Sequence, residues 1–398
     1  MDQKNAELAR RDFLRGVLAA SAPLVYGAAA DWEARGADPG KDPVSGTPPG
    51  LILREKDPEN LEFPFSGLDT FITSNEKFYI RNHFATPQLD VKSWRLKVEG
   101  AVEKPLELNY EDIKAMASKK QVTLLECAGN GRGFLVPKAT GVGWELGAVS
   151  TAEWTGVPVS AILEKAVARK DAVDIVFEGA DAGEVRADPK SPGKINFARG
   201  LTLEKALKPE VLLACRMNGD ALPIAHGFPV RLLVPGWYGM ASVKWLTRII
   251  VMDKPFQGFY QTISYSIFER RNGLPTMVPI TELSVKSAIA RPALMEAVPV
   301  NSTYKMHGAA WTGDSEVTKV EISTDAGKTW TGAKLRDKHV PFAWRFWEYE
   351  WKTPGEAGRY TVMSRATDKK GRTQPMERNA DLGTYMISHV VPIDVMVR

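Results

Sequence analysis

The sequence predicts an α+β domain over residues 66–278, followed by an all-β sandwich of the immunoglobulin type over residues 279–398. Two observations support this fold class. The first region mixes short amphipathic stretches with apolar, β-branched runs, whereas the second carries short strand candidates at regular spacing between turn signals. A length of 398 residues is sufficient for two to three domains, at roughly 150 residues per domain.

Composition excludes several classes of protein. The chain is 44% hydrophobic and 25% charged, which is ordinary for a globular protein and unlike a disordered, collagenous or coiled-coil chain. Its apolar runs are shorter than the roughly 18 residues that span a membrane. The 52 basic and 48 acidic residues leave a formal charge of +4, which is too slight to indicate nucleic-acid binding. We therefore expect neither a membrane span nor a nucleic-acid partner.

Residues 1–30 have the pattern of a twin-arginine export signal. Arg10 and Arg11 are followed by Asp12-Phe13-Leu14, an apolar run and a terminal Ala28-Ala29-Ala30. A short amphipathic helix that happens to carry two arginines is the alternative. The pattern predicts export to the periplasm in the folded state, a route that suits a protein with a bulky cofactor.

The elements of the α+β domain follow from local patterns. Residues 31–65 are rich in Gly, Pro, Asp and Glu, and predict an extended arm without regular structure. Residues 110–118 and 157–170 predict helices. Apolar or alternating runs predict strands, at residues 94–102, 122–125, 229–235 and 243–252.

Residues 281–299 have few charges and two prolines, and predict a connector to the C-terminal region. Turn signals at 325–327 and 368–371 separate the strands expected after it. Five of the eleven tryptophans fall in this region, and we assign them to core packing. The expected strands of the sandwich are residues 305–311, 317–324, 343–351 and 360–366.

The two cysteines do not form a disulfide framework or a zinc motif. Cys127 leaves a predicted strand and enters a loop with Gly129, Gly131, Arg132 and Gly133. Such a bare loop allows a large group to approach the backbone, and a nearby arginine stabilises a thiolate, which suits soft metals and nucleophilic attack. A buried structural cysteine remains the alternative. Cys215 is assigned no role.

Two further clusters place cations beside apolar strands, at residues 79–83 and at residues 226–231 with Lys244. A buried cation needs an anion, and arginine offers a planar fork for oxyanions. A lone histidine on such a strand is more often a satisfied core residue. Three cation-bearing clusters around one cysteine loop together predict an anionic cofactor or substrate beside Cys127.

Several of these motifs, in this order and spacing, resemble the sulfite oxidase family of molybdenum enzymes. The similarity extends from about residue 71 to residue 375. It is carried by Arg81-Asn82-His83, Cys127-Ala128-Gly129-Asn130, Trp144 with Gly147-Ala148-Val149-Ser150, residues 226–231, Val243-Lys244-Trp245-Leu246 and residues 282–289.

The resemblance implies a molybdopterin-binding domain of the sulfite oxidase type, which oxidises sulfite to sulfate at an oxo-molybdenum centre. It makes Cys127 the thiolate that ligates molybdenum, with molybdopterin in its mononucleotide-free form. The residues that it places in the substrate pocket are Arg81, Arg132, Trp144 and Tyr265. Those that it places against the pterin and its phosphate are Ile80, Arg81, Asn82, His83, Asp181, His226, Arg231, Ser242, Val243 and Lys244.

The resemblance also implies partners. A homodimer joined through the sandwich is the family's arrangement. No haem motif is recognised, so electrons are expected to pass singly to an external c-type cytochrome. The family's further substrate arginine has no clean match, since the surroundings of the nearest candidate, Arg378, align poorly. The neighbours of Tyr265 also differ from the vertebrate pattern.

Two other functions stay open. Within the same fold, the chain could be the catalytic subunit of a sulfane dehydrogenase, or another sulfur or sulfoxide oxidoreductase. Reductases of protein methionine sulfoxide usually lack the sandwich, which this chain is predicted to have. From a different class, a non-catalytic exported binding protein would carry a Cys127–Cys215 disulfide and no molybdenum.

Overall fold

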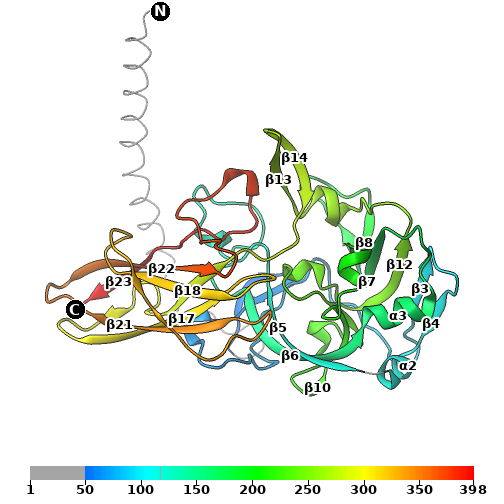
Figure 1. Ribbon diagram of the computed structural model, residues 1–398, viewed down its shortest axis with the longest axis horizontal. Coiled ribbons are helices and arrows are strands. Elements are labelled where there is room, and N and C mark those ends of the chain that lie inside the picture. The colour runs from blue at the N-terminus through cyan, green and yellow to red at the C-terminus, as the bar shows by residue number, and fades with distance from the viewer. Residues whose placement is uncertain (1–49, 117) are drawn as a thin grey trace, which may run out of the picture. The chain divides into compact units, whose positions relative to one another are not determined.

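The computed structural model describes residues 50–116 and 118–398. The predicted export signal and the first part of the predicted arm, residues 31–49, lie outside this part of the chain. In the described part, no helix is both long and apolar enough to cross a membrane. The predicted fold class is confirmed, because two sheets with short helices precede two sheets of a sandwich (Figure 1).

The first sheet of the α+β domain carries the cysteine loop at the end of one strand. Its strands pair in the order β10-β9-β6-β5, with β11 also on β9, and every pairing is antiparallel. Eight of the ten residues of β6 are buried, so apolar groups cover both of its faces. The strands are β5 (Lys119–Glu126), β6 (Val149–Pro158), β9 (Leu212–Met217), β10 (Asp220–Ala221) and β11 (Arg231–Leu233).

The second sheet of this domain has the order β4-β3-β12-β7-β8. The β-branched run of β12 pairs parallel to β3 and antiparallel to β7, which makes it the central strand. The strands are β3 (Leu96–Gly100), β4 (Leu106–Leu108), β7 (Asp174–Glu184), β8 (Lys194–Thr202) and β12 (Leu246–Met252). The helices are α2 (Tyr110–Ala115), α3 (Val159–Ala166) and α4 (Leu203–Ala206).

The C-terminal sandwich consists of a sheet with the order β15-β17-β21-β20 and a sheet with the order β16-β23-β22-β18-β19. Trp347 and Trp351 lie in its core, as expected, whereas Trp311 and Trp344 join the core of the α+β domain. The strands are β15 (Lys286–Arg291), β16 (Ala297–Val298), β17 (Thr303–Trp311), β18 (Val317–Ser323), β19 (Thr331–Gly332), β20 (Lys334–Leu335), β21 (Arg345–Lys352), β22 (Gly358–Asp368) and β23 (Ile393–Val397).

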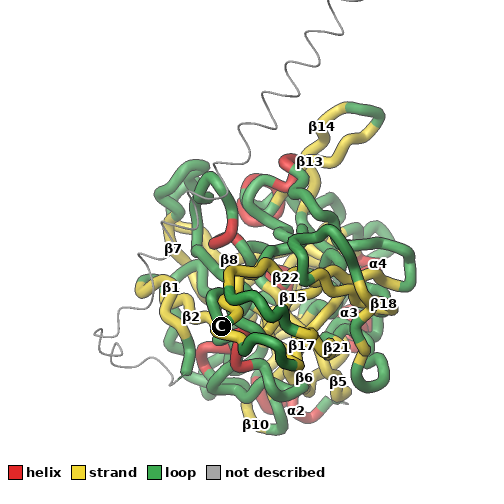
Figure 2. Tube along the Cα trace, turned by 90° about the vertical axis from the view of Figure 1, so that its left-hand side faces the viewer, coloured by secondary structure: helices red, strands yellow, loops and turns green. Residues whose placement is uncertain are grey.

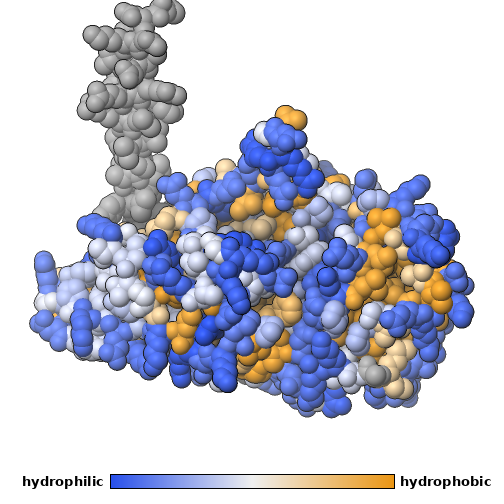
Figure 3. Space-filling view, viewed as in Figure 1, coloured by the Kyte–Doolittle hydropathy of each residue, from blue (hydrophilic) through white to orange (hydrophobic). Residues whose placement is uncertain are grey.

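A hairpin of β13 (Ser266–Arg271) and β14 (Leu274–Pro279) projects from the α+β domain (Figures 1 and 2). Its two-residue turn is Asn272-Gly273, and both residues have positive φ, which fits the right-handed twist of the strands. Figure 3 shows apolar atoms at its tip. Phe268, Leu274 and Met277 are the large apolar residues exposed on this hairpin.

Three local predictions were wrong. Residues predicted as part of an extended arm form a hairpin of β1 (Ile52–Lys56) and β2 (Glu59–Glu62), which buries Glu62 and Leu61. The predicted connector contains β15, because this segment pairs with β17 and buries Ile289 in the sandwich core and Ala288 and Ala290 in the core of the α+β domain. The helix predicted at residues 157–170 is shorter, because Val157 belongs to β6 and Val167 adopts a left-handed conformation that ends α3.

Candidate active site

Cys127 follows the last residue of β5 and lies at the start of a tight, hydrogen-bonded loop. Its backbone N–H donates to the Ala148 carbonyl at 2.9 Å, and its carbonyl accepts from the Asn130 N–H at 2.9 Å. Gly131 has a φ of +98°, a conformation that side chains disfavour. The loop therefore holds the thiol, which is 6% exposed, at a fixed position beside an internal cavity.

Both cysteines are free and buried. Cys215 lies within β9, and β6 separates β9 from β5, the strand that leads to Cys127. Neighbouring strands are about 4.8 Å apart, so two strand spacings exceed the reach of a disulfide. The geometry thus leaves the Cys127 thiol free to bind a ligand. It also excludes the Cys127–Cys215 disulfide that a non-catalytic binding protein was expected to carry.

The cavity beside Cys127, which we call the chamber, has about 610 Å³ of empty space, a figure that includes space open to solvent. It is enclosed by segments that lie far apart in the sequence. Of the residues predicted for the site, those that line the chamber are Ile80, Arg81, Asn82, His83, Cys127, Asp181, His226, Arg231, Ser242, Lys244 and Tyr265.

The chamber is rich in buried cations. Burial lowers the pKa of Lys244 well below its usual range, and lowers that of Arg231 to about 10. Burial raises the pKa of Asp181 to about 6, against the opposing effect of Lys244. A bound anion would offset the cost of burying these cations, because a charge in a low-dielectric site needs a partner.

Two buried polar atoms of the chamber have no hydrogen-bond partner among the described residues: Asp181 Oδ1 and Arg231 Nε. The remaining guanidinium nitrogens of Arg231 donate to the backbone carbonyls of His226 and Ser242, at 3.0 and 2.9 Å. Buried polar groups are normally satisfied. A ligand with hydrogen-bond donors and an anionic group would satisfy both orphaned atoms, so these residues fit a molybdopterin and its phosphate.

Tyr265 is buried and lines the chamber, with a left-handed φ of +56°. Its hydroxyl is 2.7 Å from His83 Nε2, and Arg81 Nη2 donates to the same hydroxyl at 3.5 Å. Burial, with Arg81 and Lys244, holds the pKa of His83 well below its usual range. Burial likewise raises the pKa of Tyr265. A neutral imidazole therefore faces a protonated phenol at neutral pH.

Arg132 is a predicted substrate residue that lies outside the chamber. It lines an outer cavity, which we call the vestibule, together with Cys127, Arg81 and Tyr265. Arg132 Nε donates to the Thr384 carbonyl at 3.1 Å, and Nη1 donates to the Val142 carbonyl at 3.2 Å. Arg81, Arg132 and Tyr265 thus converge on the side of Cys127 that opens to solvent.

Trp144 and Val243 line neither cavity. Trp144 was predicted to lie in the substrate pocket, but its ring is fully buried and packs edge-on against Tyr79, with centroids 6.5 Å apart. Arg378 also lies outside both cavities, and its Nη atoms are buried without a hydrogen-bond partner in the described part of the chain. Burial, and then repulsion from Arg132, lower the pKa of Arg378.

Sequence reasoning missed Tyr385, which lines the vestibule. Its ring lies 5.2 Å from the Arg132 guanidinium and 4.9 Å from the ring of Tyr265. No local motif marks this residue, which reaches the site from a C-terminal loop. The backbone N–H of the next residue, Met386, donates to the Ala128 carbonyl at 2.7 Å and ties that loop to the cysteine loop.

Sequence reasoning also missed Arg199 on β8, which is completely buried. Its guanidinium donates to the Tyr260 carbonyl and, at 2.8 Å, to the Ile280 carbonyl. The Ile280 N–H in turn donates to the Tyr265 carbonyl at 2.9 Å. Arg199 therefore joins the segments before and after Tyr265 and restrains that tyrosine.

Comparisons with known proteins agree with this site. Residues 83–260 match the family model of the oxidoreductase molybdopterin binding domain, and residues 277–394 match that of the Mo-co oxidoreductase dimerisation domain. The chain is 35% identical to sulfite oxidase from Gallus gallus over 86% of its own length and 77% of the relative's. It is 34% identical to the mitochondrial sulfite oxidase of Rattus norvegicus, over 84% of its own length but only 63% of the relative's.

Among solved structures, the chain resembles the sulfane dehydrogenase SoxCD from Paracoccus pantotrophus. The TM-score is 0.75 and the identity 26%, over 90% of this chain and 91% of the other. The two matched sequence models together cover the cysteine loop and the sandwich, and the structural likeness covers most of the chain. Together with a free Cys127 beside a cationic chamber, they show that the chain belongs to the sulfite oxidase family of molybdopterin oxidoreductases.

Proposed function

We propose that this protein oxidises sulfite to sulfate with a molybdenum cofactor held by Cys127. The reaction consumes one water and releases two protons and two electrons for each sulfite. The observation that carries the proposal is the convergence of Arg81, Arg132 and Tyr265 on the solvent side of the free Cys127 thiol. Arginine donates charge-assisted hydrogen bonds to a small oxyanion such as sulfite.

The residues of the site have different roles in this reaction. When bound, the molybdenum cofactor supplies oxygen-atom transfer and accepts the two electrons. Cys127 holds the metal, and the chamber residues hold the pterin, which we propose is the mononucleotide-free form. Arg81 and Arg132 bind and orient the sulfite oxygens from the vestibule side. His83 Nε2, at 2.7 Å, orients the Tyr265 hydroxyl and can exchange a proton with it.

We further propose that the electrons leave singly to an external c-type cytochrome in the periplasm, and that the protein carries no haem. Support for an external protein partner comes from the β13–β14 hairpin, which begins directly after Tyr265 and exposes Phe268, Leu274 and Met277. Export by the twin-arginine route and a homodimer complete the proposal, the latter supported by the match to a dimerisation domain.

Two observations favour a second candidate, the oxidation of a sulfane sulfur. The likeness to a sulfane dehydrogenase covers nearly the whole of both chains. The vestibule is also larger than sulfite and opens to solvent, and Phe259, Ile263 and Tyr385 line it. A longer substrate, with its sulfur at the end of a carrier, would fit such an opening.

The decisive experiment measures molybdenum content and sulfite-dependent reduction of cytochrome c on the same preparation, beside a Cys127→Ser variant. The proposal expects about one molybdenum per chain and sulfite activity, with both lost in the variant. Molybdenum without a response to sulfite would reject the sulfite assignment in favour of another sulfur compound. A protein made with an intact cofactor pathway but without molybdenum would reject the enzymatic function.

A further inference from the structure

Lys286, a lysine of the sandwich, is buried against the α+β domain. There it pairs with Glu126, the residue directly before Cys127. Lys286 on β15 is 2% exposed, and Glu126 at the end of β5 is 1% exposed. Lys286 Nζ donates to Glu126 Oε1 at 2.9 Å, and the two form an ion pair. Burying such an ion pair costs free energy unless further hydrogen bonds satisfy both charged groups.

Those further hydrogen bonds are present, and they all converge on the cysteine loop. Trp311 Nε1 of β17 donates to the other carboxylate oxygen of Glu126 at 2.7 Å, and Asn130 Nδ2 donates to Oε1 at 3.0 Å. Lys286 Nζ also donates to the Asn130 carbonyl at 3.0 Å. The carboxylate thus accepts three donors, two of which come from the sandwich.

The same network reaches both sides of Cys127. Glu126 precedes it, and the Asn130 N–H closes the loop on the Cys127 carbonyl at 2.9 Å. The Asn130 side-chain oxygen accepts from the Ala148 N–H at 3.1 Å, while the Ala148 carbonyl accepts from the Cys127 N–H. The position of the Cys127 thiol therefore depends on the positions of Glu126 and Asn130.

We propose that Lys286, Glu126 and Trp311 are positioning residues for the metal ligand Cys127. The sandwich then has a second role besides dimerisation, because it supplies two of the donors that set the geometry of the cysteine loop. A misplaced thiolate would hold the metal less tightly and at a different angle. The inference depends on the family assignment, and it holds whichever sulfur compound is oxidised.

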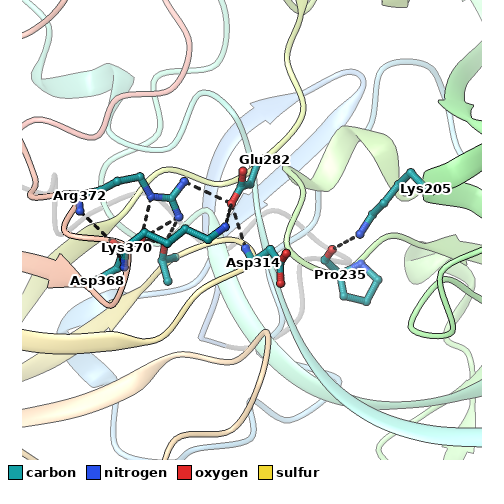
Figure 4. Close-up of polar contacts among 8 residues, drawn as sticks. Lys205, Pro235, Glu282, Asp314, Asp368, Lys370 and Arg372 are labelled. Carbon is teal, nitrogen blue, oxygen red and sulfur yellow. Dashed lines mark hydrogen bonds and ion pairs between the residues drawn. The ribbon is translucent and has the colours of Figure 1, made fainter.

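Figure 4 shows a pair in the sandwich that serves as a matched control. The Asp368 carboxylate is fully buried, like that of Glu126, and Arg372 pairs with it at 2.7 Å. Arg372 also donates to Glu282 at 3.3 Å. Within residues 50–116 and 118–398, no hydrogen bond of the Asp368 side chain reaches the cysteine loop. Asp368→Asn therefore perturbs a buried carboxylate of the sandwich without removing a contact to Cys127.

The test uses the molybdenum-loaded holoenzyme and two measurements that do not depend on turnover. One is the rate at which molybdenum is released on incubation, and the other is the electron paramagnetic resonance spectrum of the half-reduced metal. The variants are Glu126→Gln, Lys286→Gln, the double variant, Asp368→Asn and Trp311→Phe. Trp311→Phe removes one hydrogen bond while preserving most of the ring, so it remains informative if a charge variant fails to fold.

We expect Glu126→Gln and Lys286→Gln each to release molybdenum at least tenfold faster and to shift the spectrum. Trp311→Phe should act in the same direction but more weakly. The double variant leaves no unpaired charge, so it should lie closer to the wild type than either single variant. Asp368→Asn should lower thermal stability and keep the wild-type spectrum.

Two results would overturn the proposal. One is a wild-type release rate and spectrum in folded Glu126→Gln or, if that variant does not fold, in Trp311→Phe. The other is the same loss of metal and the same spectral change in Asp368→Asn, which would mean that the network acts only through general stability.

Discussion

Replacing Arg132 by glutamine tests whether the vestibule binds the substrate oxyanion. Two backbone carbonyls hold the guanidinium in place, and no described residue accepts from Nη2, which leaves that edge free for a ligand. Gly129 and Gly141 make room for it, because a Cβ on either would lie within 2.8 Å of guanidinium atoms. A hydrogen bond to a charged group contributes about 1.5–3 kcal/mol. Its loss should therefore lower kcat/KM for sulfite by about 10- to 150-fold.

The assay is steady-state reduction of a one-electron acceptor by sulfite, with kcat and KM measured separately at matched molybdenum content. Arg132→Lys keeps the charge but loses the planar fork, so its kcat/KM should lie between those of Arg132→Gln and the wild type. Arg216→Gln is the control, because among the described residues that guanidinium donates only to the Gly219 carbonyl, in the β9–β10 turn. A kcat/KM for Arg132→Gln within twofold of the wild type would refute oxyanion binding by this residue.

Three further predictions address single features of the site. Tyr385→Ala removes the ring beside Arg132 and should raise KM for sulfite at least fivefold. In Tyr385→Phe the KM should stay within threefold of the wild type. Equal KM values in the wild type and Tyr385→Ala would contradict the assignment. Gly147→Ala would place a Cβ 1.7 Å from the Phe63 carbonyl oxygen and should lower the free energy of unfolding by about 2 kcal/mol or more, measured by chemical denaturation. A Cβ at Gly143 would meet open space, so Gly143→Ala should leave that free energy unchanged. Burial lowers the pKa of His226 to about 3, whereas the same group in the unfolded chain takes up a proton near pH 6.5. This histidine alone should therefore cost the cofactor-free protein about 2 kcal/mol of unfolding free energy between pH 7.5 and 5. His226→Gln should remove that part of the pH dependence, and an unchanged slope would show that His226 is not the group responsible.

Much of the fold was predictable because it follows from local patterns. The short helix α2 begins at Tyr110, which is the predicted start, and its N-cap residue Asn109 forms a capping box with Asp112. The buried, β-branched run of β12 was predicted as a strand for the same kind of reason. The strand β15 was missed, because its small residues carry no strand signal of their own and form a strand only where they pair with β17 and are covered by the two cores.

The site, too, was predictable from the sequence only in part. Most residues that carry motifs converge on the chamber, but Arg132 lines only the vestibule, and Trp144 and Val243 line neither cavity. A motif does not reveal whether a side chain faces a cavity or the core. Tyr385 and Arg199 carry no motif, so only their contacts reveal them. The ion pair of Lys286 with Glu126 joins residues 160 positions apart, and neither position shows its partner.

The sequence by itself determined the family, the cysteine that can bind a metal and the cations around it, because these depend on the type and spacing of residues along the chain. The tertiary structure alone decided which cations face the chamber and which face the vestibule. It also decided that the Tyr265 hydroxyl meets His83, and that the sandwich contacts the cysteine loop. These features depend on burial and on contacts between distant segments, which exist only after the sheets have come together.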